Sequence, residues 1–148
     1  MNFPIYVEDV KLGEIEFTIN DIPVSFFDQA EKRPNIWTDE NIIKFGSTFP
    51  HSYIDKLSDE NREQMVEAIL EITTPKDDKK DDRKDDRKID YWIGFLISKG
   101  HTHAYQYHMR FFRTCLEITS REDEKEMARL AIASRMDEKA IKDILNGN

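Results

Sequence analysis

Apolar and polar residues alternate in two segments near the start of the chain, from Ile5 to Val10 and from Ile15 to Ile19, with a break at Leu12-Gly13. Because successive side chains of a β-strand point to opposite faces, this period of two predicts a β-hairpin. Residues 22–27 form a possible third strand. Pro23 cannot donate a hydrogen bond to a neighbouring strand, so this third strand would lie at the edge of the sheet.

The pattern becomes helical after the sheet region, and hydroxyl residues mark where two helices begin. Thr38 and Ser58 are each followed by two acids, so each hydroxyl can cap a helix whose first turn is negatively charged. We expect the first of these helices to end at Gly46. The second should end at Thr74-Pro75, because proline is not tolerated in a helix interior.

Residues 89–112 fit two templates. Apolar residues from Ile89 to Ile97 recur at helical spacing with Gly100 as the stop, whereas the alternation on both sides of Lys99-Gly100 fits a hairpin. We favour helices, because the apolar stripe continues with helical spacing as far as Leu116, where strand alternation fails.

Two further signals for the start of a helix follow. Ser120 to Asp123 has the form of a capping box, and Asp137 can cap a last helix. We therefore expect two separate helices in the last part of the chain.

A charged repeat, KDDK-KDDR-KDDR-K, occupies residues 76–88 and contains no apolar residue. Its period of four stacks aspartates at i,i+4, and aspartate is also a poor helix former. We interpret it as a charged, solvated and mobile spacer.

Together the patterns predict an α+β fold class, with a small N-terminal antiparallel sheet (the hairpin plus the possible edge strand) followed by a mainly helical body. We treat residues 1–148 as a single domain. The spacer then separates an acidic half, residues 1–75, from a charge-balanced helical half, residues 89–148.

The net charge of −8 is unevenly distributed between these parts. Residues 1–75 hold 6 Lys/Arg against 15 Asp/Glu, the repeat holds 7 against 6, and residues 89–148 hold 9 against 9. A negative field repels nucleic acid and anionic membranes and speeds the encounter with a basic partner. We therefore expect a non-enzymatic interaction or regulatory protein that binds a protein with a basic surface through its N-terminal half.

Seven residues are candidates for this protein-binding surface. Five are acids of the predicted sheet region, and two are aromatic residues of a loop between two predicted helices. Aromatic side chains are frequent energetic centres of interfaces. The candidates are Glu8, Asp9, Glu14, Glu16, Asp21, Phe49 and Tyr53.

The segment LAIASRMDEKAIKDIL, residues 130–145, resembles a helix-turn-helix unit, with a small residue at the turn, Asp137 as a cap and an Ile-x-x-Ile core in the second helix. The resemblance implies an alternative function, a nucleic-acid-binding regulator that uses residues 121–148. Arg135, Lys139 and Lys142 would contact the nucleic acid. Because residues 121–148 hold 6 basic against 7 acidic residues, this alternative ranks second.

A second alternative is a small metal-dependent enzyme that uses His101 and His103, which would need an irregular loop to bring both rings to one ion. Cys115 is the single cysteine, which excludes an intramolecular disulfide, and it is more typical of a buried apolar position. No glycine-rich phosphate loop is present, and we expect no cofactor. The N-terminus lacks a signal peptide and no long apolar run follows, so we expect a cytoplasmic protein without a membrane segment.

Overall fold

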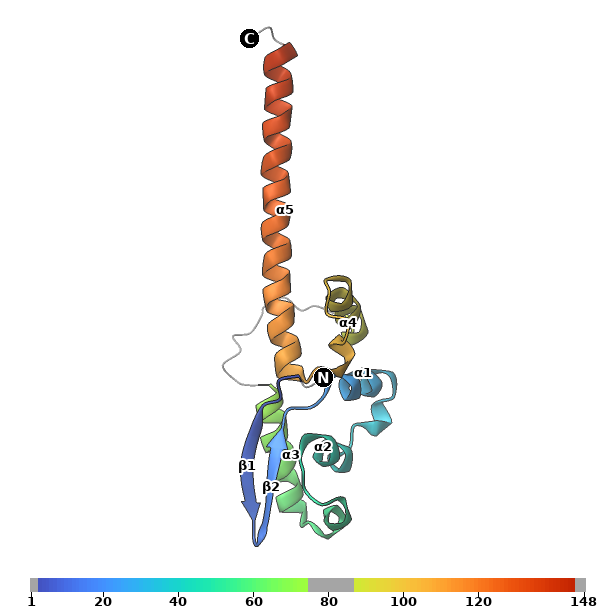
Figure 1. Ribbon diagram of the computed structural model, residues 1–148. Helices are drawn as coiled ribbons and strands as arrows, with labels where there is room; N and C mark the ends of the chain where they lie inside the picture. Colours follow the sequence, from blue (N-terminus) through green and yellow to red (C-terminus); the bar gives the residue numbers. More distant parts are fainter. Residues whose placement is uncertain (1–2, 75–86, 146–148) are drawn as a thin grey trace. The chain divides into compact units, whose positions relative to one another are not determined.

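The computed structural model describes residues 3–74 and 87–145, the last twelve of these as backbone only. The chain divides into two compact units, Met1–Thr114 and Cys115–Asn148. The first unit holds the sheet and most of the helices, and the second holds the greater part of the final helix (Figure 1). The predicted spacer, apart from Arg87 and Lys88, lies outside the described residues.

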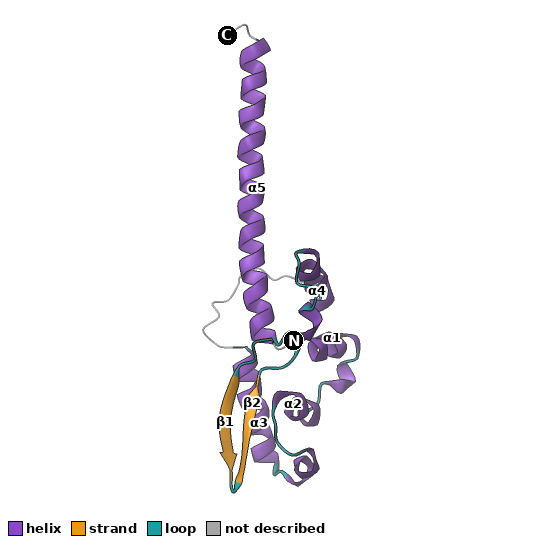
Figure 2. Cartoon of the chain, in the orientation of Figure 1, coloured by secondary structure: helices purple, strands orange, loops and turns teal. Residues whose placement is uncertain are grey.

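The predicted hairpin is confirmed. Strands β1 (Val7–Leu12) and β2 (Ile15–Asn20) pair antiparallel, with Val10 opposite Phe17 (Figure 2). They are joined by a two-residue turn in which Gly13 has φ of +62°, while the second turn residue has negative φ. Positive φ at the first turn position alone belongs to a type II′ turn, and glycine adopts that conformation without a steric penalty. The predicted α+β class therefore stands, with a two-stranded sheet ahead of a mostly helical body.

The prediction of a third strand over residues 22–27 was wrong, because residues 24–27 form the start of helix α1 (Val24–Lys32). Pro23 stands at the N-cap of α1, and its carbonyl accepts hydrogen bonds from the N–H groups of Phe26 and Phe27. A missing N–H costs nothing at the start of a helix, where no intrahelical acceptor exists, so proline suits this position as well as it suits a sheet edge.

Both predicted hydroxyl caps are observed. Thr38 accepts a hydrogen bond from Asn41 N at the start of α2 (Asp39–Gly46), and Ser58 accepts one from Asn61 N at the start of α3 (Asp59–Thr73). Short 3-10 turns precede each helix, η1 (Pro34–Ile36) and η2 (His51–Lys56). These caps satisfy N–H groups that the helices themselves leave free.

The helical interpretation of the segment after the spacer holds for α4 (Ile89–Ser98), which ends before Gly100 with φ of +103°. A 3-10 turn, η3 (Ala104–Gln106), follows, and then α5 runs from Met109 to Leu145. The predicted helix start at Ser120 and the turn before Asp137 were wrong, because α5 is continuous through both. No glycine or proline occurs within α5, so extending the helix costs less than ending it and nucleating a new one.

The core of the first unit forms between the hairpin and the helices that follow it. Its buried members are Phe17, Ile19, Ile22, Phe26, Ile42, Ile43, Phe49, Ile54, Met65 and Ile69. The inward side chains of β2 thus pack with α2 and α3, while the opposite face of the hairpin remains open to solvent. On that face Asp9, Lys11 and Glu16 are exposed, whereas Thr18 and Asn20 form hydrogen bonds with the chain that follows.

The segment after the spacer returns to the N-terminal part of the chain. Val24 N donates to Tyr107 O at 2.8 Å, and Met109 N donates to Ile22 O at 2.9 Å. Residues 87–114 therefore belong to the same compact unit as the hairpin, and the two units divide within α5. The single-domain organisation inferred from the sequence stays a prediction.

Candidate protein-binding surface

The outward face of the hairpin is polar and carries charges of both signs. Asp9 and Lys11 of β1 and Glu16 of β2 are exposed on it, and Lys11 lies directly opposite Glu16 in the strand register. Opposite charges on facing residues stabilise a strand pair modestly. Four of the seven predicted surface residues, the acids of the hairpin and its turn, are exposed as expected.

The second edge of the hairpin is extended by the chain that follows α2. Thr48 N donates to Thr18 O at 2.9 Å, and Thr18 N donates to Thr48 Oγ1 at 2.8 Å. The two threonines close one side of a shallow groove of about 560 Å³ on the hairpin face. Its lining is mostly polar and charged, and consists of Asp9, Val10, Lys11, Glu16, Phe17, Thr18 and Thr48.

Asp21, a predicted surface acid, is fully buried, so its side chain is not accessible to a partner. Its carboxylate accepts hydrogen bonds from Tyr6 N at 3.2 Å and from Arg110 N at 2.9 Å. Arg110 N lies in the first turn of α5, where a carboxylate also interacts favourably with the helix dipole. Asp21 is therefore a structural cap that joins the hairpin to α5.

His108 lies beside this buried carboxylate. Its Nδ1–H donates to the carbonyl oxygen of Asp21 at 2.7 Å, and the same nitrogen is 3.5 Å from Asp21 Oδ1. Burial alone would lower the pKa of His108, but the hydrogen bonds to Asp21 and its negative charge outweigh burial and raise the pKa above its usual 6.5.

The side chain of Arg110 contacts the residue whose N–H Asp21 also accepts. The Arg110 guanidinium lies 3.6 Å from the centre of the Tyr6 ring.

The two predicted aromatic anchors differ in position. Phe49 is buried and meets Phe17 edge to face with 5.1 Å between the ring centres, so it belongs to the core and not to a binding surface. Tyr53 is exposed, and the Lys56 ammonium lies 5.0 Å from the centre of its ring. Only Tyr53 is placed where it can meet a partner.

A row of carboxylates on α3 was not among the sequence candidates. Asp59, Glu63, Glu67 and Glu71 follow one another at i,i+4 and are all exposed. They lie on one face of the helix over about 18 Å, and we call them the α3 acidic row. The spacing of four was present in the sequence and is the signal that could have identified them.

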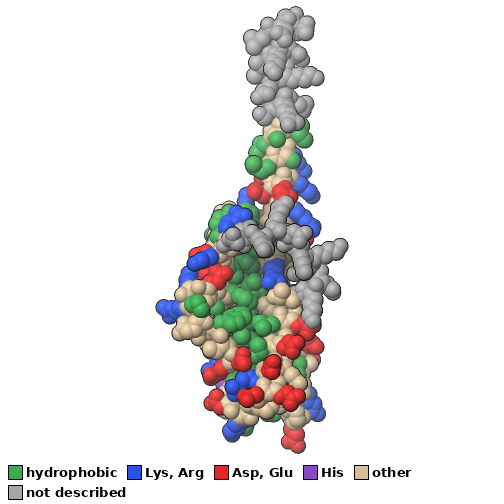
Figure 3. Space-filling model, turned by 180° about the vertical axis from the view of Figure 1, so that it is seen from behind, with side chains coloured by type: hydrophobic (Ala, Val, Ile, Leu, Met, Phe, Trp, Pro, Cys, Tyr) green, Lys and Arg blue, Asp and Glu red, His purple; other side chains and the backbone are tan. Residues whose placement is uncertain are grey.

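The α3 acidic row forms no ion pair with a described cation. Arg62 is the single basic residue of α3, and its guanidinium is directed to Ile54 O at 3.3 Å. None of the four carboxylates forms an ion pair with another described residue. Like charges at i,i+4 destabilise a helix by a few tenths of a kcal/mol per pair, so the row carries a local cost. Figure 3 shows many acidic side chains, with basic ones among them, over the lower part of the view.

The histidine pair does not form a metal centre with other described residues. His101 Nδ1 lies 2.9 Å from the hydroxyl oxygen of Tyr107, and the His103 ring lies against Phe3 with 6.1 Å between centres. Among residues 3–74 and 87–133, no group of three or more His, Cys, Asp or Glu side chains is arranged to hold a metal ion. Burial raises the pKa of the Cys115 thiol, which disfavours the reactive thiolate.

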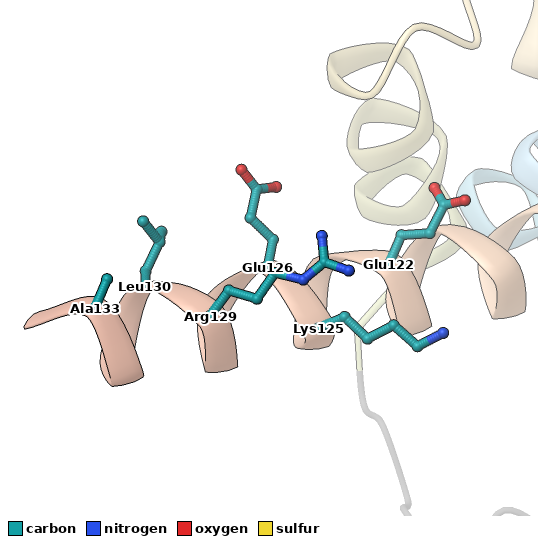
Figure 4. Close-up of a pocket in the computed structure, with 6 residues that line it drawn as sticks. All are labelled: Glu122, Lys125, Glu126, Arg129, Leu130 and Ala133. Carbon is teal, nitrogen blue, oxygen red and sulfur yellow. The ribbon is translucent and has the colours of Figure 1, made fainter. Parts of the chain in front are cut away.

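A shallow groove runs along α5 and is lined by Glu122, Lys125, Glu126, Arg129, Leu130 and Ala133 (Figure 4). All six side chains belong to one helix, so no second wall encloses a small molecule. Arg135, Lys139 and Lys142 lie further along α5, where side chains fall outside the described part. Because the backbone there is continuous helix, the turn required by a helix-turn-helix unit is absent.

Comparison with protein-family models, with curated proteins and with solved structures finds no match to this chain. None of the helices in the described residues is both long and apolar enough to cross a membrane. Evidence on function therefore comes from the surface charges and exposed side chains of the described residues.

Proposed function

We propose that this chain is a non-enzymatic interaction protein that binds a basic partner protein through the acidic surface of its N-terminal half. The observation that carries the proposal is the α3 acidic row, together with the exposed hairpin acids Glu8, Asp9, Glu14 and Glu16. An excess of exposed carboxylates creates a field that steers a positively charged surface towards them.

The surrounding geometry supports binding in preference to catalysis. The groove on the hairpin face is shallow and open, and no titratable pair of described residues is enclosed within it. Among the described residues, buried Asp21 and half-buried His108 form an acid and histidine pair, and both are engaged in backbone hydrogen bonds at the start of α5. An acidic surface around the hairpin is suited to recognition of cationic side chains.

The test compares two variants from which equal numbers of charges are removed. The first variant replaces three glutamates of the α3 acidic row by glutamine, namely Glu63, Glu67 and Glu71. The second variant is the matched control and makes the same replacement in α5, at Glu122, Glu124 and Glu126. The wild-type protein and both variants, each with an affinity tag, are cross-linked in lysate of the source cells, and captured proteins are identified by mass spectrometry. We expect basic proteins that are captured by the wild type and the control but lost with the α3 variant.

Salt provides an independent criterion. Binding to a charged surface should weaken as the salt concentration rises from 50 to about 300 mM, because exposed charges are screened beyond roughly one Debye length. Capture that is equal for all three proteins, or that does not respond to salt, would contradict the proposal.

A further inference from the structure

Strand β1 has an unpaired edge. It pairs with β2 on one side only, and no backbone hydrogen bond to a described residue is formed on the other side. No described element lies beside that edge in Figure 1. The free edge is six residues long, which is the usual length of a strand in a globular protein.

The hairpin turn determines which groups face outward. Leu12 and Ile15 flank the two-residue turn and form a hydrogen-bonded pair, and such pairs recur at every second position of an antiparallel ladder. The backbone N–H and C=O groups of Val7, Asp9 and Lys11 therefore point away from β2. These groups form a template on which another strand can pair.

The charges of this edge indicate what kind of strand it accepts. Glu8 and Asp9 are consecutive, so their side chains project from opposite faces of β1, and both are exposed. Neither forms an ion pair with another described residue. A strand added beside them satisfies both carboxylates only if it carries two consecutive basic residues, one for each face.

We propose that the free edge of β1 binds an extended segment of a basic partner protein, which adds to the hairpin as a further strand and places two consecutive Lys or Arg residues opposite Glu8 and Asp9. This inference rests on the proposed function and names the partner's conformation. Backbone hydrogen bonds to Val7, Asp9 and Lys11 supply affinity, and the two ion pairs supply selectivity.

A second copy of this chain is a poorer occupant of the same edge. Residues 1–75 hold 6 basic and 15 acidic residues, so pairing of two β1 edges brings two strongly negative surfaces together. Lys11 also stands on the edge, where lysine opposes edge-to-edge association of identical strands. A basic segment meets neither obstacle.

The first test uses a pair of variants at one position. Lys11→Pro removes an outward backbone N–H and places a ring at the edge, whereas the matched control Lys11→Ala removes the same charge and keeps the N–H. Proline is tolerated in an edge strand when the lost N–H faces solvent, so the hairpin should survive. Thermal unfolding of both variants checks this directly.

The probe is a fluorescent peptide, Thr-Val-Lys-Arg-Val-Thr, titrated into each protein at low salt and followed by fluorescence anisotropy. We expect the Lys11→Pro variant to bind it at least about tenfold more weakly than the Lys11→Ala variant, because one hydrogen bond is lost and the strand is held away from the edge. Equal binding by the two variants overturns the inference.

A second probe leaves the protein unchanged. A backbone N-methylated peptide of the same sequence keeps both positive charges but cannot donate to a β-ladder, and we expect it not to bind wild-type protein measurably. Equal binding of both peptides overturns strand addition. A dimer of the wild-type chain in light scattering that is lost in Lys11→Pro also overturns it, because a second copy then occupies the edge.

The charge variant separates this inference from the proposed function. In Glu8→Gln/Asp9→Asn the edge is intact but its carboxylates are absent, and we expect weaker binding of the peptide. If this variant loses binding while Lys11→Pro retains it, the acidic surface acts without strand addition. If Lys11→Pro loses binding while the charge variant retains it, the edge binds strands but the acidic mode of recognition is wrong.

Discussion

At the scale of single residues, the most consequential side chains are acids that cap helices far from them in sequence. Asp21 accepts a hydrogen bond from Arg110 N at the start of α5, and Glu31 accepts one from Ile89 N at the start of α4. Thr38 and Ser58, in contrast, cap the helices that directly follow them. Local caps are readable from spacing, but a remote cap depends on the folded chain, and a polar residue at a strand end is ordinarily expected at the surface.

The remote cap leads to a prediction for Asp21→Ala. The substitution leaves the N–H groups of Tyr6 and Arg110 without an acceptor inside the protein, and we expect the free energy of unfolding to fall by about 2–4 kcal/mol. Urea unfolding followed by circular dichroism measures it. The control Asp9→Ala, at an exposed position, should change stability by less than about 0.5 kcal/mol. Equal effects of the two variants would show that the buried carboxylate caps nothing of importance.

The same cluster predicts a pH dependence through His108. Its pKa in the folded protein is raised above the value of 6.5 that an unfolded chain shows, so the protonated ring stabilises the fold. That stabilisation is complete below pH 6.5 and is lost as pH rises through the higher folded pKa. The difference in free energy of unfolding between wild type and His108→Gln should therefore decrease from pH 5.5 to pH 8.5. A difference that is constant or grows with pH would refute the role of Asp21 in raising this pKa.

At the scale of elements, the packing of α2 on α3 depends on a glycine. A Cβ added to Gly46 would overlap Ile69 Cγ2, with Ile69 Cδ1 and Cγ1 at 3.0 and 3.1 Å, and Ile69 is itself fully buried. Gly46→Ala should therefore destabilise the protein by about 1–3 kcal/mol, because the core must shift to admit the methyl group. Chemical unfolding of the variant measures the loss.

Gly94 in α4 offers the opposite case. It is exposed, and no atom lies within 4 Å of an added Cβ. Gly94→Ala should stabilise the protein by about 0.5–1 kcal/mol, because alanine loses less conformational entropy in a helix than glycine does. If Gly46→Ala also stabilises the protein, helix propensity and not packing against Ile69 governs Gly46.

Local signals in the sequence predicted several elements correctly, and they failed where contacts or a continuing helix overrode them. The hairpin and both hydroxyl caps follow from period and capping residues alone, whereas α4 is favoured over a competing hairpin pattern because the helical stripe continues beyond it. The capping-box letters at Ser120 did not start a helix, because a helix was already running through them without a breaker. Of the candidate surface residues, Asp21 and Phe49 are buried by contacts that arise only after folding.

At the scale of the whole molecule, the boundary visible in the sequence differs from the boundary in the fold. The charged repeat separates an acidic part of the chain from a neutral one, yet Met109 N donates to Ile22 O in the loop after β2, and Tyr107 O accepts from Val24 N at the start of α1. The composition of a segment indicates whether its side chains can be buried in a core. Compact units are defined by long-range contacts, which cannot be read from composition. The acidic surface and the segment after the repeat therefore share one unit, Met1–Thr114.

The second unit, Cys115–Asn148, allows a prediction about the distribution of stability. Its described side chains after residue 120 are almost all exposed, including Met127, Leu130 and Ile132. An isolated helix without an apolar contact is only marginally stable in water, and helices gain most of their stability from packing. Amide hydrogens of residues 121–133 should therefore exchange at least about a hundredfold faster than those around Ile69 in α3, measured by hydrogen exchange and mass spectrometry on monomeric protein. Comparable protection in both segments would mean that the apolar side chains of α5 are covered in solution, and cross-linking at Lys125 would then locate what covers them.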